Sequence, residues 1–252
     1  MEFLPPDIDT TSAIVLVAAT FFGNIISGAM AVGGGVILLA VMANLMPVAA
    51  IIPIHGVVQL GGNIFRGTIQ RTHIDWLTFV WFAMGSVVGV AVGGSVAVAL
   101  PADVLRICLG LFILYTVWGP KLKVVGESNL VTVIVGVVSS VLTMFIGATG
   151  PFAAALLNQR GYTPQGLVGT HSACMAAQHA LKIVAFGILG FAFADWLGLL
   201  AMMLVASLAG TLIGSYALRR MTAGTFAIIL KVILTVLSVN LLAVALGLYS
   251  II

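Results

Sequence analysis

Residues 31–66 read AVGGGVILLAVMANLMPVAAIIPIHGVVQLGGNIFR, and residues 147–182 read GATGPFAAALLNQRGYTPQGLVGTHSACMAAQHALK. Placing the second stretch on the first, at an offset of 116 positions and without a gap, pairs His55 with His171 and Arg66 with Lys182. Rare polar residues at matching positions of two apolar stretches indicate an internal duplication. The sequence therefore predicts two homologous halves, each centred on a segment that glycine interrupts.

The repeat extends beyond these two stretches. After an insertion of four residues, Asp75-Trp76 matches Asp195-Trp196. Glycines spaced four apart follow in both halves, and such ridges of small residues let membrane helices pack closely. We predict a first transmembrane repeat over residues 1–120, a cytoplasmic linker over 121–129 and a second transmembrane repeat over 130–252.

The composition of the chain places these repeats in a membrane. Of 252 residues, 62% are hydrophobic and 7% are charged, whereas a soluble domain has about 25% charged residues. So few charges exclude a cytosolic enzyme and a disordered chain, and the scattered basic residues form no patch for nucleic acid. The first ten residues carry no Lys or Arg, so we expect the first apolar run to be retained as a membrane span.

The apolar runs predict helices because they are long and do not alternate with period two. A spanning helix needs about 20 apolar residues, so the pieces after the two breaks are too short to cross a membrane. The expected segments are residues 13–46 (broken at 33–35), 48–66, 76–100, 104–118, 130–158 (broken at 149–151), 164–189, 196–218 and 225–248. The predicted fold is an all-α polytopic membrane protein in which each half has a glycine-broken helical hairpin followed by three transmembrane helices.

The distribution of charge predicts that the two halves have opposite orientations in the membrane. Lys and Arg favour the cytoplasmic side. The loop after Arg66 would then be inside, whereas the matching loop at Asp195 would be outside. This relation is an inverted-topology repeat. The residues placed inside are Arg66, Arg71, Lys121, Lys123, Arg160, Arg219 and Arg220, and those placed outside are the acidic N-terminus, Asp103 and Asp195.

Polar side chains form a stripe on the helix that follows each break, and all of them fall within one arc of the helix surface. The first stripe consists of His55, Gln59, Asn63 and Arg66, and the second of His171, Gln178, His179 and Lys182. A charge inside a bilayer costs at least about 2.5–3.5 kcal/mol unless it faces protein or water. We therefore expect both stripes, and Lys182 in particular, to face a cavity at the midplane. The alternative is that Arg66 and Lys182 extend to the membrane surface.

The two breaks are candidate anion sites. Glycine permits the turn, and proline suits the first turn of a new helix, so each break starts a half-helix whose N-terminus offers free N–H groups. Broken helices at corresponding positions of two halves indicate the binding site of a transporter. With no carboxylate near either break, the ligand is expected to be an anion. The residues assigned to the breaks are Gly33, Gly34, Gly35, Thr149 and Gly150; the alternative is a simple packing hinge.

His55 and His171 lie about two turns into their helices. Because imidazole titrates near pH 6.5, protonation of either ring would strengthen anion binding and link it to a proton gradient. The alternative is that both rings are neutral and hydrogen-bond the broken hairpins.

No other chemistry is indicated. The sequence lacks the HExxH, GxSxG, GxGxxG and Walker patterns, so an enzyme and ATP-driven transport are not expected. Cys108 and Cys174 have no metal-ligand spacing, so we expect no metal, no cofactor and no disulfide. The expected partners are a small anionic substrate and the lipid bilayer, and a homodimer is compatible with the sequence.

The chain resembles the TauE/SafE family of bacterial sulfite and organosulfonate exporters. The resemblance rests on Gly33-Gly34-Gly35 with His55-Gly56 and Asp75-Trp76, and on residues 147–151 with Thr170-His171-Ser172 and Asp195-Trp196. It implies a multi-pass protein of the bacterial cytoplasmic membrane that exports a sulfur-containing anion. Sulfite, or an organosulfonate such as sulfoacetate or a taurine-derived sulfonate, would move outward with an ion gradient. Two alternatives remain: a passive anion channel, and a membrane-embedded enzyme or assembly subunit.

Overall fold

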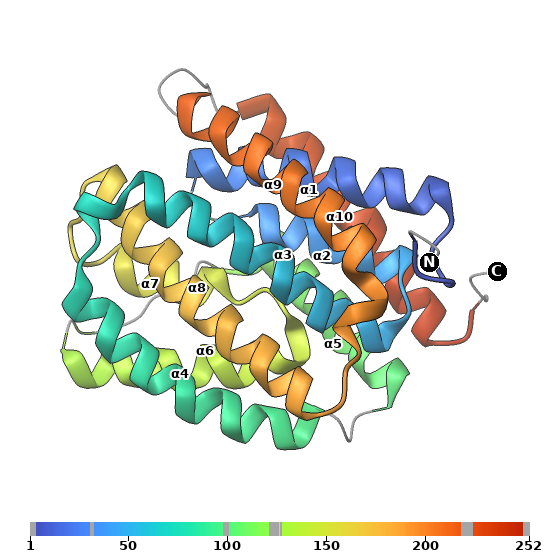
Figure 1. Ribbon diagram of the computed structural model, residues 1–252, viewed down its shortest axis with the longest axis horizontal. Helices are drawn as coiled ribbons and strands as arrows, with labels where there is room; N and C mark the ends of the chain where they lie inside the picture. The colour runs from blue at the N-terminus through green and yellow to red at the C-terminus, as the bar shows by residue number, and fades with distance from the viewer. Residues whose placement is uncertain are drawn as a thin grey trace.

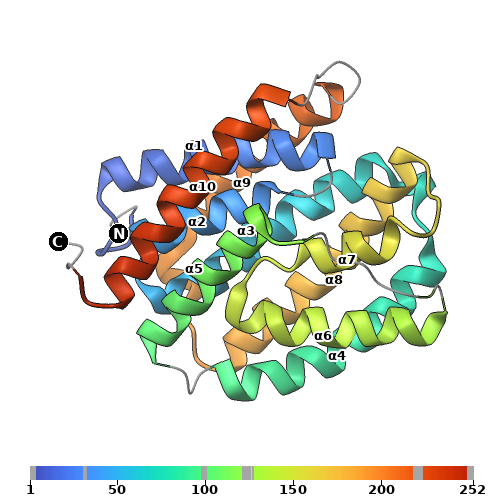
Figure 2. The ribbon, with the colours of Figure 1, turned by 180° about the vertical axis from the view of Figure 1, so that it is seen from behind.

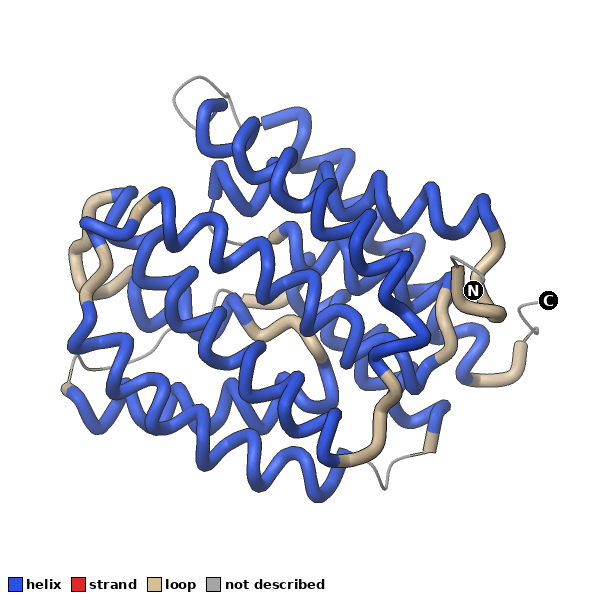
Figure 3. The backbone as a smooth tube through the Cα atoms, viewed as in Figure 1, coloured by secondary structure: helices blue, strands red, loops and turns tan. Residues whose placement is uncertain are grey.

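The computed structural model describes residues 4–30, 33–97, 101–120, 126, 128–217 and 224–248. These residues form α-helices, two short 3-10 helices and connecting loops, and they contain no strand (Figure 3). The prediction of an all-α fold is therefore confirmed. Lys121, Lys123, Arg219 and Arg220, which were expected on the cytoplasmic side, and most of the predicted linker lie outside the described residues.

Among the residues that the structure describes, each half of the chain has five α-helices in the order that the sequence predicts (Figures 1 and 2). The first half comprises α1 (Thr10–Met30), α2 (Gly34–Leu45), α3 (Val48–Ile69), η1 (Arg71–His73), α4 (Trp76–Ala97) and α5 (Ala102–Trp118). The second comprises α6 (Asn129–Ile146), α7 (Gly150–Leu157), α8 (Pro164–Ile188), η2 (Phe193–Trp196), α9 (Leu197–Ala217) and α10 (Gly224–Ala245).

Five segments of the described chain are long and apolar enough to cross a membrane. They are Thr10–Ala29, Val48–Ile69, Trp76–Gly94, Asn129–Ile146 and Phe193–Tyr216. Large apolar side chains on α4, α6 and α9 are exposed, among them Val87, Val138 and Val205. An exposed apolar surface of this kind suits lipid rather than water. Helix α8 has the length of a span but is less apolar, because it carries the second polar stripe.

Both halves contain the predicted break, and glycine geometry accounts for it. Gly33 precedes α2 with φ of 112°, and Gly147 ends α6 with φ of 82°. Residues with a side chain rarely adopt such angles, so the chain turns there at little cost because both residues are glycine. In the second half, Pro151 lies in the first turn of α7, where its missing N–H removes no intrahelical hydrogen bond. The sequence therefore predicts both half-helices correctly.

The packing of glycines shows how the helices run relative to one another. Gly56 near the start of α3 contacts Lys182 late in α8, whereas Gly67 late in α3 faces Ser172 early in α8. Helices α3 and α8 are therefore antiparallel. Since α2 leads into α3 and α7 leads into α8, the two half-helices extend in opposite directions from their N-termini. Those N-termini meet in the middle of the bundle.

The predicted glycine ridges are confirmed as packing surfaces. Gly85 and Gly89 of α4 lie against the backbone of α6, and Gly210 and Gly214 of α9 lie against the backbone of α1. A Cβ atom at any of them would overlap a carbonyl oxygen of the neighbouring helix. Both pairs of helices run parallel, and each pairs a helix of one half with a helix of the other. The two halves are thus interleaved around α3 and α8.

A polar cluster joins the two halves at the end of the molecule where α3 ends and α8 begins. The Asp75 carboxylate accepts hydrogen bonds from the hydroxyls of Tyr162 and Thr78, the latter at 2.7 Å. Arg160 Nη1 donates to Thr78 Oγ1 and Arg160 Nη2 to Thr132 Oγ1, both at 2.6 Å. Burial raises the pKa of Asp75, but hydrogen bonds from Tyr162 and Thr78 outweigh it and hold the pKa below 3.8.

Replacing Asp75 with asparagine is expected to lower the stability of the protein by about 1 kcal/mol, because the amide accepts these hydrogen bonds less strongly. The folded-state pKa is lowered, so the carboxylate stabilises the fold fully above its ordinary pKa and loses this effect as the pH falls through the folded value. Melting temperatures of wild type and Asp75→Asn should therefore differ at pH 7 and converge in acid. The exposed counterpart Asp195 provides the control, and an equal effect of Asp195→Asn would contradict the prediction.

Candidate anion-binding site

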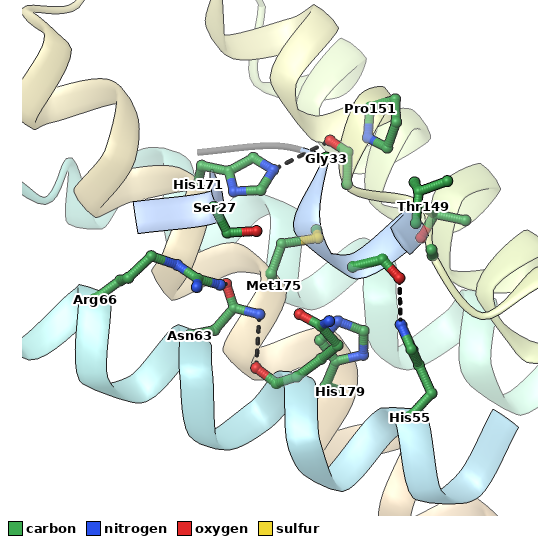
Figure 4. A pocket seen from close by; sticks show the side chains of 15 residues that line it. Ser27, Gly33, His55, Asn63, Arg66, Thr149, Pro151, His171, Met175 and His179 are labelled. Carbon is green, nitrogen blue, oxygen red and sulfur yellow. Dashed lines mark hydrogen bonds between the residues drawn. The ribbon is translucent and has the colours of Figure 1, made fainter. Parts of the chain in front are cut away.

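A small cavity of about 40 Å³ lies where the two half-helices meet (Figure 4). A volume of this size holds roughly three water molecules, or one small inorganic ion. Its walls come from both halves of the chain: Ser27, Gly33, Gly35, Val36, His55, Gln59, Asn63 and Arg66 from the first, and Ala148, Thr149, Gly150, Pro151, His171, Met175 and His179 from the second. None of these residues is acidic, so the cavity carries no negative side chain.

The N-termini of both half-helices border this cavity. The first N–H groups of a helix have no intrahelical acceptor, and they carry the positive end of the helix dipole. Neither the Gly33 end of α2 nor the Thr149 end of α7 is capped by a side chain. The Thr149 hydroxyl instead donates to Gln178 Oε1 at 2.9 Å. Two half-helix N-termini without a side-chain cap thus border one cavity, where the positive ends of both helix dipoles add to the potential.

Each half-helix is held by a histidine of the helix that follows it. His55 Nε2 lies 2.9 Å from the carbonyl oxygen of Gly35, and His171 Nε2 lies 3.1 Å from that of Gly150 (Figure 4). Both rings are buried, and Nδ1 of each has no hydrogen-bond partner. The ring of His179 lies 6.0 Å from that of His55, centroid to centroid. These contacts agree with the alternative that the two rings hydrogen-bond the broken hairpins. A role of the histidines in anion binding stays a prediction.

Arg66 places a buried positive charge at the cavity. It is only 2% exposed, so it does not extend to the surface of the bundle. Its Nη1 donates to Asn24 Oδ1 at 3.0 Å and its Nη2 to Asn63 Oδ1 at 2.9 Å, while Nε has no partner. Both partners of Arg66 are neutral amides. The ion pair that joins Arg106 to Asp103 lies elsewhere in the described part of the chain. The charge of Arg66 is therefore oriented but not neutralised.

Three of the predicted site residues do not line the cavity. Gly34 packs against the backbone of Gly23 in the hairpin. Gln178 donates to Ser139 and Ser140 of α6, at 3.1 and 2.8 Å. Lys182 is fully buried, as expected, but its Nζ donates to the Gly147 carbonyl at 3.1 Å and lies 3.5 Å from Thr143 Oγ1. Gln178 and Lys182 of the second stripe thus point toward the C-terminal part of α6 and the turn that follows it, and not into the cavity.

The remaining predicted site residues are brought together, and the structure adds others. Five residues line the cavity although the sequence did not predict them there: Ser27, Val36, Ala148, Pro151 and Met175. The repeat could have predicted Met175, because this residue matches Gln59 at the offset of 116 positions. Ser27 could also have been predicted, because Thr20, Asn24 and Ser27 lie at positions i, i+4 and i+7 of one apolar helix and form a short polar stripe. Asn24, which orients Arg66, belongs to the same stripe.

The chain is similar to one family of known proteins. The model of the family described as Sulfite exporter TauE/SafE matches residues 16–241, which is most of the chain. No curated protein and no solved structure matched the sequence. The matched region contains both breaks and every residue that lines the cavity. This protein, a multi-pass membrane protein with a positively charged cavity between two broken helices, therefore belongs to the TauE/SafE sulfite exporter family.

Proposed function

We propose that this protein is a secondary active transporter that exports a small sulfur oxyanion of the sulfite class across the bacterial cytoplasmic membrane, driven by an ion gradient. The observation that carries the proposal is the convergence of two uncapped half-helix N-termini and the buried Arg66 on one cavity without a carboxylate. Positive potential, N–H donors and a guanidinium are the groups that bind oxyanions in proteins.

The size of the cavity favours an inorganic ion over a larger organosulfonate. About 40 Å³ accommodates the oxygens of sulfite but leaves little room for the carboxymethyl group of sulfoacetate. Organosulfonates such as taurine-derived sulfonates are therefore the less favoured substrates.

The arrangement of the two halves supports alternating access through an inverted repeat. Equivalent helices α3 and α8 are antiparallel, and the half-helices α2 and α7 extend toward opposite ends of the bundle. In transporters with inverted repeats, substrate binds near the midplane between discontinuous helices, and one repeat moves against the other. We propose the same relation here, with the end that bears Arg71 and Arg160 in the cytoplasm.

Counterflow in proteoliposomes tests the function. Vesicles loaded with unlabelled sulfite should accumulate radiolabelled sulfite transiently from the outside, and the rate should saturate. A passive channel gives flux that follows the gradient and shows no such overshoot. If purified protein produces neither flux nor binding with sulfite, the proposed function is wrong.

Thiol labelling tests the orientation. Cysteine is introduced at Thr72 or at Asp195, both exposed, into a variant in which Cys108 and Cys174 are serine. An impermeant reagent added to intact cells should label the Asp195→Cys variant and leave the Thr72→Cys variant unlabelled. Labelling of both from the same side would exclude an inverted repeat.

A further inference from the structure

We infer that the transported anion is bound in a hydrogen-bearing form, as hydrogen sulfite rather than sulfite, with its O–H group donating to Nδ1 of His55 or His171. This inference rests on the proposed function and specifies the protonation state of its substrate. It also implies that the proton moves with the anion rather than on a protein side chain.

The partners of the two histidines determine where each ring carries its hydrogen. A backbone carbonyl oxygen can only accept, so Nε2 of His55 must donate to Gly35 and Nε2 of His171 must donate to Gly150. In the neutral ring, Nδ1 then has a lone pair and no hydrogen. Nδ1 of His55 and Nδ1 of His171, both buried and without a protein partner, are therefore acceptors; Nδ1 of His179 is also unpartnered, but no contact of that ring fixes where its hydrogen lies.

A buried acceptor without a partner is unfavourable, and a ligand that supplies a hydrogen removes that penalty. Donors are already present around the cavity: Arg66 Nε has no partner, and the N-terminal ends of α2 and α7 border it, although Pro151 of α7 has no N–H. A fully deprotonated anion accepts hydrogen bonds from these donors, but it has no hydrogen to donate to either imidazole. An anion that keeps one O–H accepts from these donors and also donates to one of the two imidazoles.

The charged groups around the histidines favour the neutral rings. Arg66 on α3 and His179 and Lys182 on α8 are the titratable side chains nearest to them, and none is acidic. Helices α1, α2, α6 and α7 contain no Asp, Glu, Lys, Arg or His. A third positive charge on His55 or His171 would be added beside two cations with no carboxylate to offset it. The hydrogen is therefore carried more favourably by the anion.

Three probes of similar size test the inference by the pH dependence of binding to the purified wild-type protein. Hydrogen sulfite and hydrogen selenite both carry a hydrogen, and hydrogen selenite is the weaker acid; methanesulfonate carries no O–H. If the hydrogen belongs to the ligand, affinity for selenite should persist to higher pH than affinity for sulfite. Methanesulfonate should bind about ten- to hundredfold more weakly, with no change across the same pH range.

Titration of the protein would give a different result. If a histidine supplies the proton, all three anions lose affinity at the same pH. That outcome, or methanesulfonate binding as tightly as hydrogen sulfite, overturns the inference while the proposed transport of an anion stands. Absence of binding by all three probes contradicts the proposed function itself.

A matched pair of variants locates the acceptor. In His171→Gln the side-chain amide nitrogen can occupy the position of Nε2 and keep the contact with Gly150, but the acceptor at Nδ1 is lost. In His171→Asn an amide oxygen can stand near the position of Nδ1, but the contact with Gly150 is lost. We expect the preference for hydrogen selenite over methanesulfonate to fall about tenfold in His171→Gln and to be largely kept in His171→Asn.

Binding of methanesulfonate shows that each variant is folded, since it does not depend on the acceptor. The corresponding His55→Gln and His55→Asn variants test the other half. An unchanged preference in both glutamine variants overturns the inference.

Discussion

Replacing Arg66 with methionine is expected to abolish binding of sulfite, with a loss of affinity of at least about 100-fold. A hydrogen bond to a charged group contributes about 1.5–3 kcal/mol, and each 1.4 kcal/mol is a factor of ten in affinity. Arg66 presents several N–H groups and is the permanently charged residue among those that line the cavity. Calorimetric titration of the purified protein, or the shift of its melting temperature with added sulfite, measures the loss.

Two variants separate the role of Arg66 from that of positive charge in general. Arg71→Met removes an exposed arginine of η1 and should leave binding unchanged. Arg66→Lys keeps the charge but cannot hold Asn24 and Asn63 together, so we expect an intermediate affinity. Wild-type affinity in folded Arg66→Met would show that the cavity is not the anion site.

Lys182→Met provides a further comparison. Lys182 is predicted from the sequence to be a ligand of the anion. In the structure, its amine donates a hydrogen bond to the Gly147 carbonyl beside the second break. If Lys182 acts only by positioning this break, its loss should weaken binding less than the loss of Arg66. If Lys182→Met abolishes binding in a folded protein, its amine reaches the anion in another state of the transporter.

Replacing Gly34 with alanine is expected to destabilise the protein by about 3 kcal/mol or more, or to prevent folding. A Cβ atom at this position would overlap the carbonyl oxygen of Gly23, and a backbone atom in a packed hairpin cannot move away. For a chain of this size, 3 kcal/mol corresponds to a fall in melting temperature of about 6–12 °C. Thermal unfolding of the purified protein, together with its yield, checks the prediction.

Gly150, the repeat partner of Gly34, is the matched control. A Cβ atom there would lie 3.4 Å from His171 Nε2, which is an ordinary contact, and we expect Gly150→Ala to fold. Any loss of transport in that variant would then report on the site rather than on stability. Similar melting temperatures for the two alanine variants would contradict this account.

The sequence by itself determined the membrane class, the two breaks and the helices around them. These features follow from local chemistry: few charges, apolar runs of the length of a bilayer, and glycine or proline where the chain must turn. The repeat also follows from the sequence, because duplication leaves rare residues such as His55 and His171 at a constant offset. The close contacts of α4 with α6 and of α9 with α1 were also visible, as glycines spaced four apart.

Only the tertiary structure decided which polar groups face the cavity. A helical stripe spans an arc wide enough to meet two neighbours, so its members can separate. His171 and His179 face the cavity, whereas Gln178 and Lys182 of the same stripe bind α6. Asn24 and Ser27 belong to a short polar stripe of α1 and reach the site because α1 folds back on α2. Packing between distant segments determines which of these polar side chains meet at the cavity.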